Sequence, residues 1–277
     1  NYDGIQAAAE AGADMDQVKI DGVSQNPILY LWNPSPRPLF IEQLLKNGSD
    51  ANYADRNGNT LLMYASGYEP QKYGFLPGKG NYSSADYAEL FLRYDADVSQ
   101  QNKEGWTALD YAVQLDDDMA AMNLLLSYGA EVTPVVLSHA LDFEGAYTHY
   151  QRIHKLVALL DSSQTSTILT PIFDAAIRGD NATVQELATK TDLSEAERLQ
   201  TLCHAVAFCN ADTVRLLLAD GFGTIQTINA ADNTLLQIAA MQNNTDVMNF
   251  LLKQGSWDTE SRDAALCTAI RNNSTEA

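Results

Sequence analysis

The stretch Thr234-Leu235-Leu236-Gln237-Ile238-Ala239-Ala240, followed by Val247-Met248-Asn249-Phe250-Leu251-Leu252-Lys253-Gln254-Gly255, decides the fold. It contains two short apolar helical patterns and closes at a glycine, a residue that commonly ends helices. The same order recurs at Thr107–Ala112 with Leu124–Ala130, and at Thr60–Ala65 with Leu90–Leu92. A pattern that returns at a fixed spacing predicts a repeat architecture, in which each copy is one small helical unit.

A further copy carries a family resemblance; it reads Thr170-Pro171-Ile172-Phe173-Asp174-Ala175-Ala176-Ile177-Arg178-Gly179-Asp180. These stretches resemble the ankyrin repeat, whose signature is a Thr-Pro-Leu-His-x-Ala-Ala opening, a leucine-rich second helix and a Gly-Ala turn, at a period of about 33 residues. Two spacings agree with that period, because Gly221 and Gly255 lie 34 positions apart, as do Asp95 and Gly129. The resemblance implies an all-α solenoid of helix-turn-helix units joined by hairpin loops.

The resemblance covers nearly the whole chain and predicts a single domain over residues 1–277, with about seven full units and a partial one at each end. The predicted units are 1–16 (partial), 17–54, 55–100, 101–132, 133–165, 166–193, 194–228, 229–260 and 261–277 (partial). The unit at 133–165 lacks the Thr-x-Leu opening, so we expect it to be distorted. No unit buries its apolar faces alone, so stability is expected to be a sum over units and nearest-neighbour interfaces.

Small and capping residues stand where such units need them. An alanine in each first helix allows close packing on the neighbouring unit; these residues are Ala65, Ala112, Ala175 and Ala239. A threonine before each helical run is expected to cap it, because its hydroxyl accepts a hydrogen bond from an otherwise unpaired backbone N–H. The capping residues are Thr60, Thr107, Thr170 and Thr234.

The charge balance narrows the class of partner. The chain has 36 acidic and 17 basic residues, a formal net charge of −19. A nucleic-acid partner is not expected, because a phosphate backbone is bound by clustered Lys and Arg. The negative charge has two interpretations: it keeps the chain soluble, or it attracts a protein with a basic patch and speeds association at low salt. The free chain is expected to be a monomer.

Motifs for catalysis, metals and cofactors were sought and are not present. The sequence has no Gly-rich phosphate loop, His-Glu-x-x-His pattern or Gly-x-Ser-x-Gly elbow, so we expect no enzyme activity, no metal and no cofactor. His139 and Asp142 are three positions apart on a helical pattern, but a solvated or capping role is the expected one. Cys203 and Cys209 lie in apolar helical patterns and are predicted to be buried thiols, and His204 is expected to be structural.

The sequence is compatible with more than one cellular compartment. No run of about 18 apolar residues occurs, so membrane insertion is not expected. The chain begins within a helical pattern, so an export signal could have preceded it; the cytoplasm is slightly favoured over the periplasm or secretion.

The unit at 55–100 carries an insertion at residues 67–84, which exceeds the family spacing by about fourteen residues. Its glycines and prolines oppose helix formation, and its aromatic residues include Tyr73 and Phe75. Long loops in compact repeats are often functional, so this loop is a candidate second contact. The alternative is that its rings fold back onto the solenoid.

Ankyrin repeats usually bind through the hairpin tips and the exposed side of the first helix, which together form a concave strip. Carried over to this chain, that surface comprises Arg56, Asn57, Asn59, Lys103, Glu104, Trp106, Gln114, Leu115, Ile177, Arg178, Phe208 and Met241. Trp106 is the expected anchor, because a large ring directly after the turn residue Gly105 is poorly placed to join the core. The alternative is that it covers a neighbouring hairpin.

The resemblance therefore implies a protein-protein interaction module, with a basic protein as the expected partner. Scaffold and adaptor roles fit these residues, and so does an inhibitor or immunity-type protein that captures a basic target. The competing hypothesis is a regulatory or targeting segment of a larger enzyme whose catalytic domain lies outside this chain.

Overall fold

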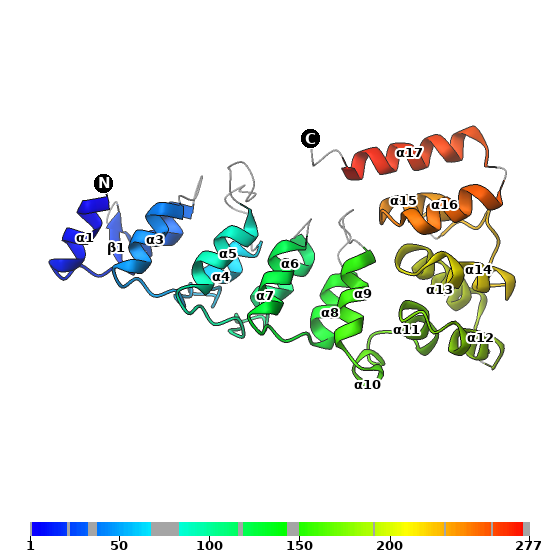
Figure 1. The fold of residues 1–277 in the computed structure, drawn as a ribbon, viewed down its shortest axis with the longest axis horizontal. Helices are drawn as coiled ribbons and strands as arrows, with labels where there is room; N and C mark the ends of the chain where they lie inside the picture. The colour runs from blue at the N-terminus through cyan, green and yellow to red at the C-terminus, as the bar shows by residue number, and fades with distance from the viewer. Residues whose placement is uncertain are drawn as a thin grey trace. The chain divides into compact units, whose positions relative to one another are not determined.

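Short helices follow one another in pairs along the chain (Figure 1). The computed structural model describes residues 2–20, 23–32, 38–67, 83–115, 119–142, 150–190, 192–229, 231–255 and 257–273. In these residues the predicted all-α helix-turn-helix architecture is confirmed, with one local exception. That exception is a two-stranded antiparallel hairpin of β1 (Val18–Ile20) and β2 (Val23–Gln25), which pairs Val18 with Gln25 and Ile20 with Val23.

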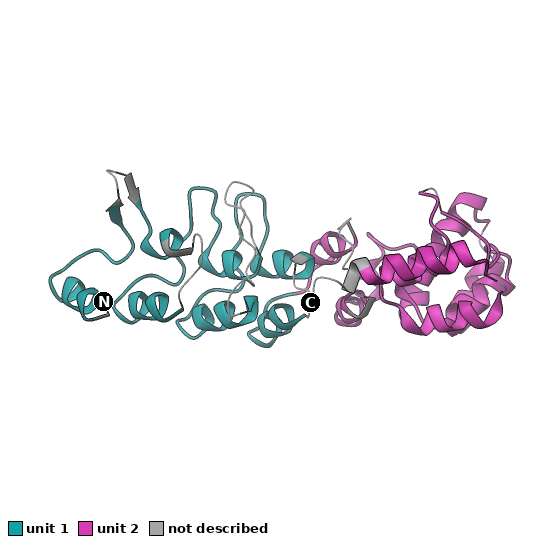
Figure 2. Ribbon diagram, turned by 90° about the horizontal axis from the view of Figure 1, so that it is seen from above, with its two compact units in different colours: residues 1–131 teal, residues 132–277 magenta. Residues whose placement is uncertain are grey.

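Contacts group the chain into two compact units, residues 1–131 and residues 132–277 (Figure 2). The boundary falls between the repeat predicted at 101–132 and the divergent one predicted at 133–165. Each unit is described by itself below.

Unit 1 contains two rows of helices. Its helices are α1 (Tyr2–Glu10), α2 (Pro27–Trp32), α3 (Pro38–Lys46), α4 (Leu61–Ala65), α5 (Ser84–Leu92), α6 (Ala108–Leu115) and α7 (Ala120–Ser127). The second helices α1, α3, α5 and α7 each pack on the next, and the first helix α4 packs on α6. Within a pair, α4 packs on α5 and α6 on α7, so each helix has cover from its own pair and from its neighbour.

Unit 2 repeats this arrangement. Its helices are α8 (Pro134–Asp142), α9 (Tyr150–Leu159), α10 (Ser162–Thr165), α11 (Pro171–Ile177), α12 (Asn181–Lys190), α13 (Glu195–Phe208), α14 (Ala211–Ala219), α15 (Leu235–Met241), α16 (Thr245–Gln254) and α17 (Thr259–Asn273). The first helices α11, α13, α15 and α17 form one row, and the second helices α12, α14 and α16 form the other.

The predicted alanine and threonine positions are confirmed. Ala65, Ala112 and Ala239 have no exposed surface, and Ala175 is also buried. The hydroxyls of Thr60, Thr170 and Thr234 each accept a hydrogen bond from the backbone N–H three residues later. Thr107 does the same before α6, where its own N–H and hydroxyl also donate to the carboxylate of Asp110. Each first helix thus begins at a satisfied cap.

Buried amides tie neighbouring hairpins together. Asn102 is 8% exposed; its Nδ2 donates to Asn59 Oδ1 at 2.8 Å and to the Tyr111 hydroxyl at 2.9 Å. The Lys103 N–H donates to the Asn57 carbonyl at 2.9 Å. Gly58 has a φ of +83°, and a Cβ at this position would lie 3.1 Å from the Asn102 Cα, so the close approach of the two hairpins requires glycine.

In the repeat predicted at 133–165, the packing of the second helix differs from that of the other second helices. α9 packs against the first helices α11 and α13. The extra turn α10 follows it, and Thr165 from that turn donates to Asp174 Oδ1 at 2.7 Å. Arg178 completes the link, because its Nε donates to Asp174 and its Nη2 donates to the Leu160 carbonyl at 3.0 Å. This arrangement joins α9, α10 and α11.

Replacing Asn102 by alanine tests how much the buried amide contributes to unit 1. The substitution removes the partner of Asn59 and of Tyr111, and also the acceptor for the Glu104 and Trp106 N–H groups. Buried polar groups left without partners cost about 1–3 kcal/mol each, so we expect Asn102→Ala to lower the free energy of unfolding by about 2 kcal/mol or more. Urea denaturation followed by circular dichroism measures it.

The matched control is Lys103→Ala, an exposed neighbour in the same hairpin, which should change the free energy by less than about 0.5 kcal/mol. Equal effects for the two variants would show that the amide does not hold the hairpins together.

Candidate protein-binding surfaces

The hairpin tips of unit 1 present exposed polar side chains. Arg56 and Asn57 lie at one tip and Lys103 and Glu104 at the next, and all four are exposed. In unit 1, the β1–β2 hairpin and the loops after α3 and α5 project to the same side of the helices (Figure 2). The Lys103–Asn57 backbone hydrogen bond fixes the spacing of the two tips. We call these four residues the hairpin-tip surface.

Trp106 stands beside this surface and is half-buried. Its ring lies 4.9 Å from that of Tyr111 between centroids, with the planes tilted by 43°. Its backbone is held by Asn102, whose Oδ1 accepts from the Trp106 N–H at 2.9 Å and whose N–H donates to the Trp106 carbonyl. The ring therefore covers Tyr111 and keeps part of its surface in solvent.

Other predicted residues of the strip have different surroundings. Gln114 is half-buried near the end of α6; Leu115 is the last residue of that helix, and its side chain lies outside the described residues. Met241, the last residue of α15, is half-buried. Tyr73 and Phe75 of the insertion also lie outside the described residues.

Three predictions of an exposed contact residue are corrected by the packing, and a fourth residue, Arg178, is exposed but makes contacts within unit 2. Asn59 is 2% exposed because it bonds Asp55 and Asn102, and Ile177 is 2% exposed in the core of α11. Phe208 is 8% exposed, in the cavity described below. The Arg178 guanidinium is committed to Asp174 and the Leu160 carbonyl, with 27% of its side chain exposed. Spacing on a helix did not reveal these partners.

Asp174 is ionised and accepts hydrogen bonds from Thr165 and Arg178, a cluster that we call the Asp174–Arg178 clasp. Burial opposes its negative charge, but hydrogen bonds from Arg178 and Thr165 outweigh burial and hold the pKa of Asp174 below its usual value. Arg178 is therefore a structural residue in unit 2.

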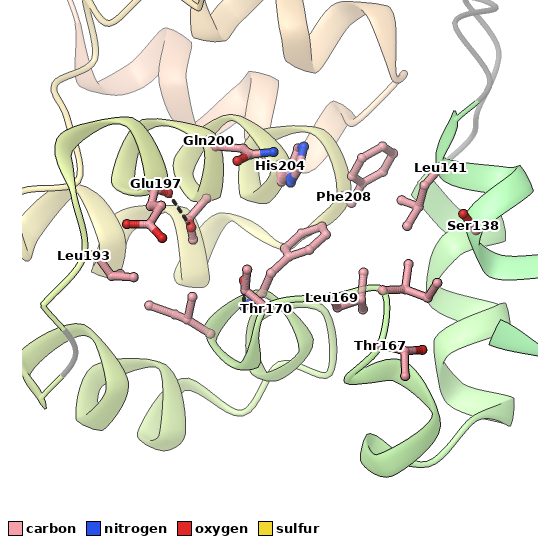
Figure 3. A pocket seen from close by; sticks show the side chains of 14 residues that line it. Ser138, Leu141, Thr167, Leu169, Thr170, Leu193, Glu197, Gln200, His204 and Phe208 are labelled. Atoms are coloured by element: carbon pink, nitrogen blue, oxygen red, sulfur yellow. Dashed lines mark hydrogen bonds between the residues drawn. The ribbon is translucent and has the colours of Figure 1, made fainter. Parts of the chain in front are cut away.

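A cavity of about 500 Å³ lies in unit 2 among α8, the segment before α11, and the helices α11 and α13 (Figure 3). Figure 3 shows Leu193 and Glu197 at one end, Ser138 and Leu141 at the other, and His204 and Phe208 between them. The lining residues are Ser138, Leu141, Thr167, Ile168, Leu169, Thr170, Ile172, Phe173, Leu193, Glu197, Gln200, Thr201, His204 and Phe208. We call this cavity the unit 2 groove.

Three rings form the wall of the groove. The Phe173 centroid lies 4.9 Å from that of His204 and 6.4 Å from that of Phe208, and His204 lies 6.4 Å from Phe208. Tilted ring pairs at these distances are favourable. Burial lowers the pKa of His204, so its imidazole is neutral near pH 7. Behind this wall, burial also lowers the pKa of His154, although a hydrogen bond to the Phe208 backbone opposes the shift.

Glu197 gives the groove an acidic end. Its Oε2 accepts from the Ser194 hydroxyl at 2.6 Å and from the Ser194 N–H at 2.8 Å, in a capping box at the start of α13. The hydroxyl and then the N–H lower the pKa of Glu197. The carboxylate therefore stays ionised at neutral pH.

Residue spacing in the sequence does not predict this groove. Among its lining residues, only Phe208 was expected to contact a partner, and His204 was expected to be structural. Leu141, Phe173 and His204 come from three different helices, so no local spacing could have brought them together. The absence of the Thr-x-Leu opening at 133–165 was the signal that the packing there departs from the regular repeat.

The three cysteines are free thiols that differ in burial. Cys209 is buried and Cys203 half-buried; both thiols are free, and burial raises the pKa of each. Cys267 is free and exposed.

Within the described residues, none of the helices has the length and apolar character that a membrane crossing requires.

Stacked helix-turn-helix units with capped first helices and linked hairpins define a helical repeat protein. A family model described as ankyrin repeats (3 copies) matches residues 35–135 and 202–277, more than half of the chain. The chain belongs to the ankyrin-repeat family. Ankyrin repeats are protein-protein interaction modules, and domains built from them are typically non-catalytic.

Solved structures show distant similarity. The human ASB11 ankyrin repeat domain has 19% identity and a TM-score of 0.41, with 92% of this chain and 99% of that chain covered. The ankyrin repeat domain of Bcl-3, of the IkappaB family, has 17% identity and a TM-score of 0.46, with 91% of each chain covered. A complex of the Bdellovibrio bacteriovorus endopeptidase Bd0816 with immunity protein Bd3460 has 18% identity and a TM-score of 0.28, covering 91% and 97%. These similarities carry no function to this chain. No curated protein matches it.

The buried imidazole of His204 predicts a pH dependence of stability. In the unfolded chain its pKa returns to about 6.5, whereas the folded value is lower. Below about pH 6.5 the unfolded chain binds the proton and the folded chain does not, so stability is fully present above that pH and is lost as pH falls toward the folded pKa. We expect a lower urea midpoint at about pH 5.5 than at about pH 7.5.

His204→Gln should reduce that difference, and His154 should maintain part of it, since its pKa is shifted in the same direction. Carboxylates with lowered pKa values, such as Asp174, titrate below about pH 4 and do not contribute in this window. An unchanged pH dependence in His204→Gln would contradict the assignment.

Proposed function

We propose that this chain binds another protein through the hairpin-tip surface of unit 1, with Trp106 as an adjacent anchor. One observation carries the proposal: the Lys103–Asn57 and Asn102–Asn59 hydrogen bonds hold the two tips together. The four side chains of the hairpin-tip surface nevertheless stay exposed. A surface that is already ordered loses little conformational entropy on binding, which favours affinity.

The finer form of the proposal is that the partner has a basic patch. The formal net charge of −19 over the whole chain supports it, because the long-range field of an acidic protein attracts a basic one and accelerates encounter. At about 0.1 M salt the Debye length is about 10 Å, so binding of this kind weakens as salt is added. An inhibitor or immunity-type role is a special case, in which the bound protein is an enzyme whose activity this chain blocks.

Charge reversal at one tip tests the proposal. Glu104→Lys should lower retention of the partner by about tenfold in affinity capture from the source lysate, because one favourable charge contact becomes a repulsive one. The matched control is Glu131→Lys, the same change at an exposed residue in the loop before α8. We expect it to reduce retention less than about twofold, since distant charges are screened.

A second arm uses Trp106→Ala, with urea denaturation to show that the variant is folded. Loss of the same captured protein with Glu104→Lys and Trp106→Ala, and its elution by salt, would support the proposed surface. Equal retention by all variants would show that the partner binds elsewhere.

A further inference from the structure

We propose that the unit 2 groove binds an extended segment of a partner protein in which a large apolar side chain is followed or preceded closely by Lys or Arg. The apolar side chain would lie against Phe173, Phe208 and Leu141, and the cation would pair with Glu197. This inference rests on the proposed function, since it supplies a second contact for a protein partner.

The apolar end has the size and lining of a binding pocket. The cavity volume of about 500 Å³ falls within the range of about 300–1,000 Å³ that ligand sites occupy. Its lining at this end includes Leu141, Leu169 and Phe208 (Figure 3), and Phe173 also lines the cavity. Phe173 and Phe208 are 4% and 8% exposed and are held by their neighbours, so the part of each ring that lines the cavity has a fixed geometry.

The opposite end of the groove is acidic and would favour a positively charged side chain of the partner. Glu197 is the one acidic residue lining the groove in the described part of the chain, and exposed Asp192 and Glu195 lie close to it in sequence. The nearby cation Arg198 is not among the lining residues; its Nε donates to the Leu193 carbonyl, and its guanidinium lies 5.4 Å from the Phe222 ring centroid. His204, between the two ends, is neutral near pH 7 and does not repel a cation.

The separation of the two ends of the lining favours a chain segment over a compact ligand (Figure 3). The two ends differ in chemistry and are separated by the His204 and Gln200 side chains (Figure 3). Neighbouring side chains of an extended peptide point to different places along such a groove. One apolar and one basic residue, close in sequence, satisfy both ends.

The test uses an immobilised array of synthetic hexapeptides of randomised sequence, probed with the labelled full chain. The bound peptides should be enriched in sequences that place Leu, Ile, Phe or Met within about three positions of Lys or Arg. Gln200→Trp fills the groove from an exposed position of α13 and should lower the signal by about tenfold. The matched control Gln185→Trp, exposed on α12 outside the groove, should lower it less than about twofold.

A second pair of variants isolates the charge. Glu197→Gln keeps the capping box of α13, because Gln also serves at that position, and should reduce the preference for Lys and Arg by about fivefold while the apolar preference remains. Glu195→Gln, two residues earlier on the same helix and outside the groove lining, should leave the preference within about twofold. Methyl NMR of Leu141 and Leu169 should show shifts on adding a selected peptide.

Several outcomes would overturn the proposal. They are enrichment without the apolar-basic pairing, no enrichment, or equal binding by Gln200→Trp. Sedimentation that shows a dimer of the intact chain and a monomer of Gln200→Trp would assign the groove to a second copy of this chain instead. Glu104→Lys should leave peptide selection unchanged, so failure of the groove and failure of the hairpin-tip surface are distinguished by separate variants.

Discussion

Apolar faces shared between neighbouring helix pairs are the constraint on which this structure depends. Helices of 4 to 15 residues are too short to be stable alone in water, so each must bury its face against the next pair. α13 illustrates this, because Leu202, Ala205 and Val206 have no exposed surface between α11 and α15. The alanines of the first helices set how closely the rows approach, and the buried amide of Asn102 orders the hairpins between them.

A similar amide serves unit 2. Asn244 is 1% exposed; its Oδ1 caps α16, and its Nδ2 donates to the carbonyls of Val206 and Cys209 in the preceding repeat. Asn102 and Asn244 are at different positions of the repeat but solve the same problem, since each pairs backbone or side-chain groups that neighbouring repeats would otherwise bury without partners. The order of the exposed tips is thus a consequence of the buried polar contacts beneath them.

The distorted repeat gives unit 2 its groove. α9 lies against α11 and α13, and the Asp174–Arg178 clasp with Thr165 keeps α10 and α11 in place. Leu141 of α8 consequently lines the same cavity as Phe173 and Phe208. A regular repeat would supply side chains for close packing at this position. The groove to which we assign a partner segment is therefore a product of the irregular repeat and not of the regular pattern.

The sequence by itself determined the repeat, the helix pairs and their caps, because these depend on residues close in the chain: the Thr234 cap, the small Ala239 and the Leu-rich second helices are all read locally. Tertiary structure alone decided which polar and aromatic side chains remain accessible to a partner protein. Asn59, Ile177 and Arg178 fit an exposed spacing but are taken up by partners far along the chain or in the core, and the groove joins Leu141, Phe173 and His204 from three helices. Spacing predicts which face of a helix a residue occupies, whereas only packing shows what covers that face.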